Sequence, residues 1–173
     1  MPDLVILPVH DLTAGQRPAK SRYWRVMATF QNTVTIRRAI EDVFAFLADF
    51  ENVPTWNYAI VETKKTSPGP VAVGTTYRQI RSIPDRSEER FEVTALEPSS
   101  RLDVHGNIGH FITTISYLLT PTGDGTRLTN VVDLKLSSGV LRLLAPLAAS
   151  RVKASVAANL DTLKQVLETG QPT

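Results

Sequence analysis

The 173-residue chain contains no cysteine. This absence excludes disulfide bonds, thiolate nucleophiles and cysteine metal sites, and it agrees with a reducing cytoplasm, which is the location we expect. Long apolar runs are missing as well. The longest one near the start, Leu4 to Leu7, is too short for the core of a signal peptide or for a membrane span. We therefore expect no stable insertion into a membrane.

An excess of one charge sign is also absent. Lys and Arg number 19 against 17 Asp and Glu, which gives a net charge of +2 at pH 7. The two signs alternate along the chain, as in Glu88-Glu89-Arg90. A nucleic-acid-binding face requires a concentrated stripe of Lys and Arg, and the sequence has none. We expect no nucleic-acid partner.

Histidine is scarce, with only His10, His105 and His110 in the chain. None of them forms an HxH or HxxxH pair, so we expect no metal site. His105 is out of phase with the apolar Val104 and should face solvent. "GDGT" lies in a hairpin rather than between a strand and a helix, so it is not a phosphate-binding loop. We expect no cofactor, and His110 remains open as a proton carrier.

The sequence divides into an extension and one domain. Residues 1–26 have no sustained hydrophobic period and contain Pro2, Pro8, Gly15 and Pro18, which predicts a flexible extension. Residues 27–170 are continuously patterned, without internal repeats, and predict a single ligand-binding domain.

Periodicity predicts an α+β domain. Phe30, Val34 and Ile36 share the face of a strand, whereas Val152, Val156, Leu160, Leu163 and Leu167 form the apolar stripe of a long helix. The expected elements are a strand over Thr29–Arg38, a short helix from Ile40 to Phe50, a second short turn after Pro54, strands from Ala59 to Ser137 with a hairpin at Pro121–Thr126, and a helix from Pro146 to Thr169. A curved antiparallel sheet of about seven strands should wrap around this last helix and leave a cavity.

Four stretches resemble one known superfamily: "IRRAIEDVFAFLADFENVPTWN", "TSPGPVAVGTTYR", "VTALEPSSRL" and "YLLTPTGDGTRLT". They look like the SRPBCC superfamily, also called START-like or Bet v 1-like, and specifically its polyketide cyclase/dehydrase-type branch. The resemblance extends over about Ala28 to Glu168 and implies the helix-grip fold. It further implies a cavity between sheet and C-terminal helix that binds a small, mostly apolar ligand such as a lipid, isoprenoid, quinone or polyketide-like compound. The alternative it implies is a metal-free cyclase/aromatase or dehydratase that uses the same cavity.

Several polar side chains share strand faces with apolar ones. Gln79 and Arg81 are in phase with Tyr77, and Glu89 is in phase with Phe91. Buried polar groups need partners, which a ligand could supply, or Arg81 and Glu89 could pair across adjacent strands. The candidate ligand-binding residues are Trp56, Tyr77, Gln79, Arg81, Glu89, Phe91, His110, Tyr117, Asn130, Val152 and Val156.

The catalytic residues, if any, and the oligomeric state are left open. Asp49 and Glu51 could form an acid/base pair, but their spacing at a helix end favours a solvated turn, with Asn52 as the cap of the next turn. Trp56 is either a residue at the mouth of the pocket or ordinary core packing. Two or more ionisable groups that meet within the cavity would favour an enzyme. An almost wholly apolar cavity would favour a carrier.

Overall fold

The computed structural model describes residues 27–108, 111–136 and 145–170. The predicted extension and His110 lie outside these residues. The elements are, in chain order, β1 (Met27–Ile36), α1 (Ile40–Ala48), the 3-10 helix η1 (Phe50–Thr55), β2 (Ile60–Lys65), β3 (Thr76–Arg81), β4 (Ser87–Glu97), β5 (Arg101–Ile108), β6 (Phe111–Thr122), β7 (Gly125–Leu136) and α2 (Ala145–Thr169). This order confirms the predicted succession of strand, two short helices, six strands and long helix.

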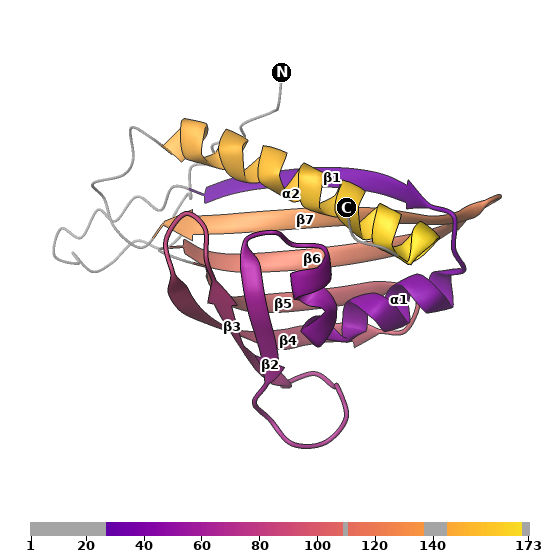
Figure 1. Cartoon of the computed structure of the whole chain (residues 1–173), viewed down its shortest axis with the longest axis horizontal. Coiled ribbons are helices and arrows are strands. Elements are labelled where there is room, and N and C mark those ends of the chain that lie inside the picture. Colours follow the sequence, from indigo (N-terminus) through magenta and orange to yellow (C-terminus); the bar gives the residue numbers. More distant parts are fainter. Residues whose placement is uncertain (1–26, 109–110, 137–144, 171–173) are drawn as a thin grey trace, which may run out of the picture.

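The strands form one antiparallel sheet in the order β1-β7-β6-β5-β4-β3-β2. The segment that contains α1 and η1 therefore carries the chain from one edge of the sheet to the other. Figure 1 shows α2 crossing the sheet along β1, and α1 lies over the same face, against β6 and β7, whereas η1 packs against β2. A curved antiparallel sheet that grips a C-terminal helix is the predicted helix-grip fold.

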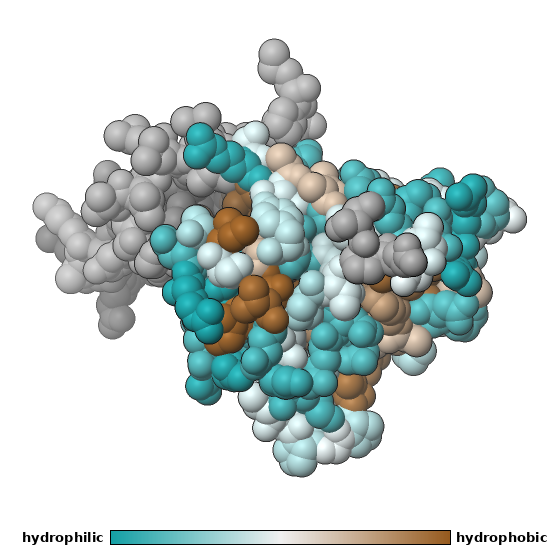
Figure 2. Space-filling model, in the orientation of Figure 1, coloured by the Kyte–Doolittle hydropathy of each residue, from teal (hydrophilic) through white to brown (hydrophobic). Residues whose placement is uncertain are grey.

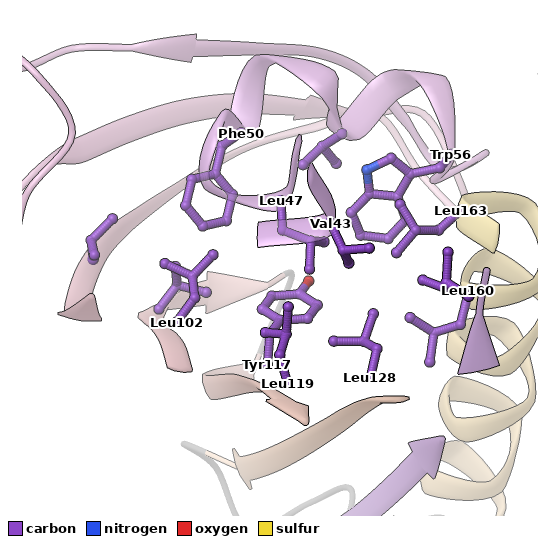
Figure 3. Close-up of a cluster of buried hydrophobic side chains, with 14 of the residues drawn as sticks. Val43, Leu47, Phe50, Trp56, Leu102, Tyr117, Leu119, Leu128, Leu160 and Leu163 are labelled. Carbon is purple, nitrogen blue, oxygen red and sulfur yellow. The ribbon is translucent and has the colours of Figure 1, made fainter. Parts of the chain in front are cut away.

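The core lies between this face of the sheet and the helices. On β7 the alternating residues Leu128, Asn130, Val132 and Leu134 are all buried, as the period of two predicts. Figure 3 shows Leu160 of α2 beside the side chains that rise from the sheet. The stripe on α2 therefore faces the sheet.

The corner between α1 and η1 is built from polar groups that face solvent. Asp49 is exposed, and its Oδ1 accepts a hydrogen bond of 3.1 Å from the backbone N of Glu51. Glu51 is also exposed and accepts from the backbone N of Lys65 at 3.2 Å. These contacts confirm a solvated helix end. Asn52 does not cap η1 as expected, because its Nδ2 donates back to the carbonyl oxygen of Phe46 at 3.2 Å. Asp49, the residue directly before η1, takes the capping position instead.

The β6–β7 hairpin depends on Gly125. Its φ is +154°, and a Cβ atom there would lie 2.2 Å from the carbonyl oxygen of Ile36. The strand β1 therefore approaches the hairpin too closely for any side chain at this position. The predicted hairpin thus also carries a tertiary contact that its sequence does not reveal.

The C-terminal end of α2 is anchored to the β1–α1 connection by Glu168. Its carboxylate accepts hydrogen bonds from the backbone N of Arg37 at 2.8 Å and from Nζ of Lys164 at 2.8 Å. Hydrogen bonding to Lys164 and to the Arg37 backbone lowers the pKa of Glu168 from 4.5 to about 2. Gly170 follows with φ +76° and ends the helix, as predicted.

The surface in Figure 2 is largely hydrophilic, and its hydrophobic side chains form small separate patches. Such scattered apolar residues are normal for a folded domain. The large hydrophobic side chains that are exposed among the described residues are Tyr58, Val61, Val73, Ile83, Ile112 and Leu118. His105 is exposed as predicted, and its Nδ1 lies 3.0 Å from Oγ1 of Thr114.

Candidate ligand-binding cavity

A cavity of about 70 Å³, partly open to solvent, lies between η1 and strands β3 to β6. It is large enough for several water molecules or for part of a small organic molecule. The wall is mostly apolar and rich in aromatic rings. The described residues that line it are Phe50, Val53, Trp56, Asn57, Gln79, Arg81, Phe91, Val104, Gly106, Thr113, Ile115 and Tyr117.

The cavity lies farther from α2 than predicted. Of the described residues that line it, none belongs to α2. Val152 and Val156, predicted to contact a ligand, instead pack as half-buried side chains against the cluster of Phe30, Val132 and Leu134. Val152 and Val156 therefore pack on the part of the sheet formed by β1 and β7, and η1 forms the second wall of this cavity. This cavity thus lies between the sheet and η1, whereas the expected ligand contacts of Val152 and Val156 stay a prediction.

Three predicted residues form a polar network on β3 and β4. Gln79 is paired in register with Glu89, and its Nε2 donates a hydrogen bond of 2.6 Å to Oε2 of Glu89. Arg81 donates from Nε to Oε1 of Glu89 at 2.7 Å and from Nη2 to Oε2 at 3.2 Å. Gln79 and Arg81 line the cavity, whereas the Glu89 side chain is only 2% exposed behind them. The predicted Arg81–Glu89 pair across adjacent strands is thereby confirmed.

An aromatic cluster forms the neighbouring part of the wall. Phe91 stacks on Tyr77 with ring centroids 5.1 Å apart, and it meets Phe50 edge to face at 5.2 Å. Phe50 and Phe91 line the cavity, and Tyr77 packs against both of them without lining it. Burial, assisted by the negative charges of Asp49 and Glu51, raises the pKa of Tyr77 to about 12. Tyr77 is therefore neutral at physiological pH and cannot act there as a base.

Polar groups also lie on the far side of the cavity, on β6 and β7. Tyr117 lines it, and burial raises the pKa of its hydroxyl. Asn130 is paired in register with Tyr117 and is buried, but it does not line the cavity. Thr113 does line it, and its residue is only 2% exposed. Within the described residues, Oγ1 of Thr113 and Oδ1 of Asn130 have no hydrogen-bond partner.

Trp56 follows η1 directly, is 6% exposed and lines the cavity. Figure 3 shows its indole between the short-helix corner and Leu163 of α2. Trp56 therefore contributes both to the cavity wall and to the hydrophobic core. The core-packing interpretation is confirmed, and the position of Trp56 at the mouth of the pocket stays a prediction.

Sequence reasoning missed more than half of the lining residues. Val104, Thr113 and Ile115 lie on inward strand faces that the period of two identifies, but periodicity does not select the rows that border a cavity. Gly106 carries no pattern at all. A Cβ atom there would lie 2.3 Å from the carbonyl oxygen of Arg90, so the glycine permits close approach of β4 and β5. The other missed residues are Phe50, Val53 and Asn57.

Two further searches covered the described residues only. Among residues 27–108, 111–136 and 145–170, no group of three or more His, Asp or Glu side chains is placed to hold a metal ion. No helix within these ranges has the length and apolar character needed to cross a membrane.

Comparison with protein families gives one match. Residues 27–168 match the family described as polyketide cyclase/dehydrase and lipid transport. The chain belongs to this family. The match spans β1 to the last turn of α2, so it includes the whole cavity wall. Curated proteins give no match to the sequence.

Solved structures with a similar fold confirm that the fold of this chain is START-like. The protein TTHA0849 from Thermus thermophilus has a TM-score of 0.69 at 16% identity, with 81% of this chain and 97% of that chain covered. The di-domain ARO/CYC StfQ from the steffimycin biosynthetic pathway has a TM-score of 0.69 at 16% identity, with 83% and 51% covered. A START superfamily protein from Mycobacterium smegmatis has a TM-score of 0.60 at 16% identity, with 78% and 98% covered. At these identities the likeness concerns the fold alone.

Proposed function

We propose that the protein binds a small, mostly apolar molecule in the cavity between η1 and strands β3 to β6. One observation carries this proposal: aromatic and aliphatic side chains form most of the wall, and a few polar groups are set into it. The ligand class expected from the sequence remains a lipid, isoprenoid, quinone or polyketide-like compound. The family description, which includes both polyketide conversion and lipid transport, is compatible with this class.

Binding would be driven by transfer of apolar ligand surface from water to the aromatic wall. Gln79, Arg81 and Thr113 would orient the ligand through its polar groups. The present cavity of about 70 Å³ is smaller than a typical pocket for a multi-ring ligand, for which roughly 300 Å³ or more is usual. A larger ligand would therefore require η1 to move away from the sheet. We therefore propose that the short-helix corner and the Gly-Pro loop at residues 66–74 control entry of the ligand.

The emission of Trp56 tests this proposal directly. The chain has two tryptophans, and replacing Trp24 by Phe leaves Trp56 as the only emitter. Titration with the neutral apolar dye N-phenyl-1-naphthylamine should quench Trp56 through energy transfer and should increase the emission of the dye. A Trp56→Phe, Trp24→Phe variant provides the background signal. Unchanged emission of both Trp56 and the dye at saturating dye concentration would refute binding in this cavity.

The natural ligand requires a separate measurement. The protein purified from its own organism should carry extra mass in native mass spectrometry, and organic extraction should release the bound molecule. A protein that is reproducibly empty would contradict constitutive carriage of a lipid.

A second candidate function is acid/base catalysis of the cyclase/aromatase or dehydratase type. The observation that favours it is the ion pair of 2.7 Å between Arg81, which lines the cavity, and Glu89 on the adjacent strand. Two ionisable groups at a confined ligand can transfer protons or stabilise developing charge. Conversion of the ligand recovered from the native protein would support this function if Glu89→Gln abolished turnover and left binding intact. A ligand recovered unchanged after incubation with the wild-type protein would refute it.

A further inference from the structure

Arg81 is the only charged side chain among the described residues that line the cavity. A lone cation in an apolar wall would attract anionic ligands such as fatty acids and other carboxylates. The guanidinium is not alone, however, because it forms an ion pair of 2.7 Å with Glu89 on the adjacent strand. We propose that Glu89 acts as a built-in counterion, so that the cavity selects uncharged ligands and excludes carboxylates. This inference rests on the proposed ligand binding and specifies the chemical class of the ligand.

The first step of the argument is the balance of charge. The side chains of Arg81 and Glu89 are 17% and 2% exposed, and two hydrogen bonds join them. Glu89 accepts a further hydrogen bond from Gln79. A buried ion is stable only when an opposite charge and hydrogen bonds replace its water shell. Arg81 already has both in Glu89, so it gains little from a second anion.

The second step concerns a charged ligand. A carboxylate that approached Arg81 would enter with Glu89 close by, and the cavity lining contains no second cation among the described residues. The site would then hold two negative charges against one positive charge in a region of low dielectric constant. An ammonium group would face the opposite problem, because Arg81 stands between it and Glu89. Both kinds of ion would lose hydration without adequate compensation.

The third step concerns an uncharged polar group. A hydroxyl or carbonyl can form hydrogen bonds with wall groups and leave the charge balance unchanged. Thr113 offers such a group, because its buried Oγ1 has no partner within the described residues. Phe91, Gly106 and Thr113 are consecutive partners across β4, β5 and β6, and Gly106 leaves the middle of this row without a side chain. Gly106 and Thr113 both line the cavity, so a neutral ligand there can contact the bare backbone of Gly106 and reach Thr113.

Three probes with the same two-ring skeleton test charge selection: 2-naphthol, 2-naphthoate and 2-naphthylmethylammonium. We expect titration calorimetry at pH 7 and low salt to show binding of 2-naphthol. Both ions should bind more weakly by about tenfold or more, which corresponds to about 1.4 kcal/mol. Equal affinities for 2-naphthol and 2-naphthoate would overturn the counterion role of Glu89 and would leave apolar ligand binding intact. If none of the three probes bound, and N-phenyl-1-naphthylamine also failed to bind, the proposed function itself would fall.

Two complementary variants assign the selection to the ion pair. Glu89→Gln keeps the shape and leaves Arg81 without its counterion, so 2-naphthoate should gain about tenfold or more relative to 2-naphthol. Arg81→Gln removes the guanidinium from Glu89 and keeps the carboxylate, so the gain should pass to 2-naphthylmethylammonium. Added salt should reduce both gains, because they are electrostatic.

The matched control is Asp103→Asn. Asp103 is buried on β5 and pairs with Arg101 at 2.5 Å, but neither residue lines the cavity. This variant removes a carboxylate from the same sheet and should leave the ratio of probe affinities unchanged. Circular dichroism and thermal unfolding identify any variant that does not fold. If either Glu89→Gln or Arg81→Gln does not fold, the other variant still tests the role of the ion pair. A ratio that is the same in wild type and in the folded cavity variants would overturn the proposal.

Discussion

Phe91→Ala is the substitution that best connects the packing of the fold to the size of the cavity. The ring of Phe91 stacks on Tyr77, meets Phe50 edge to face, and forms part of the cavity wall. Its removal deletes two aromatic contacts and joins the space of the ring to the existing cavity. We therefore expect lower stability together with a change in ligand size preference.

The magnitude follows from the surroundings of the ring. Truncation of a buried Phe costs about 3–5 kcal/mol, and aromatic pairs contribute about 0.5–1.5 kcal/mol each within such totals. Phe91 is half-buried and one side of its ring borders the cavity, so part of its surface has no packed neighbour to lose. We therefore expect a loss in the free energy of unfolding at or below the lower limit of this range, at about 2–3 kcal/mol.

Urea unfolding followed by circular dichroism measures this loss without relying on Trp56, which lines the same cavity. The control is Phe46→Ala, because Phe46 packs against the same core and does not line the cavity. Both variants should be less stable than the wild type. Only Phe91→Ala should raise the ratio of the affinity for N-phenyl-1-naphthylamine to the affinity for phenol, which has a single ring. A loss below about 1 kcal/mol for Phe91→Ala would contradict the packed ring cluster. An identical affinity ratio in the two variants would contradict the place of Phe91 in the wall.

Two further predictions concern an ion and a glycine. The pKa of Glu168 is lowered to about 2, so its contribution to stability is complete above pH 4.5 and is lost as the pH falls toward 2. Because Arg37 is 71% exposed, solvent screening limits this contribution to about 1 kcal/mol. In thermal unfolding, the difference in stability between wild type and Glu168→Gln should shrink from pH 6 to pH 3. A difference that stays constant over this range would refute the role of Glu168 as an anchor. Gly106→Ala should lower the free energy of unfolding, measured in urea, by about 1–3 kcal/mol. The reason is that its Cβ would lie 2.3 Å from the Arg90 carbonyl oxygen and 2.6 Å from Cβ of Phe91. A variant as stable as the wild type would show that β4 and β5 are not so close.

Much of the fold could be predicted because local sequence patterns agree with the tertiary structure. The period of two along β7 placed Leu128 and Asn130 on one buried face, and the stripe with Leu160 and Leu163 identified the face of α2 that meets the sheet. The same phase argument brought Arg81 and Glu89 together on adjacent strands, and the structure joins them at 2.7 Å. Periodicity succeeds in these cases because it reports which way a side chain points.

The cavity could not be located in the same way. Val152 and Val156 pack toward the sheet, against the cluster of Phe30, Val132 and Leu134, but they are not among the described residues that line the cavity. Whether an inward side chain meets a neighbour or a cavity depends on the separation of two elements that are distant in sequence. The capping of η1 was also misassigned, because Asn52 and Asp49 are both able to cap and only the turn geometry distinguishes them.

The sequence by itself determined the class of fold, the order of the elements, the inward faces of the strands and the absence of thiol chemistry. These properties follow from residue type and from the local hydrophobic period. The period reports which way each side chain points, because backbone geometry sets the side-chain direction. Only the tertiary structure decided that η1 and strands β3 to β6 enclose the cavity, that β4 and β5 approach closely at Gly106, and that Glu89 pairs with Arg81 at its wall. Those properties depend on distances between residues far apart in the chain. Such distances are set by how the short-helix corner and α2 share one face of the sheet.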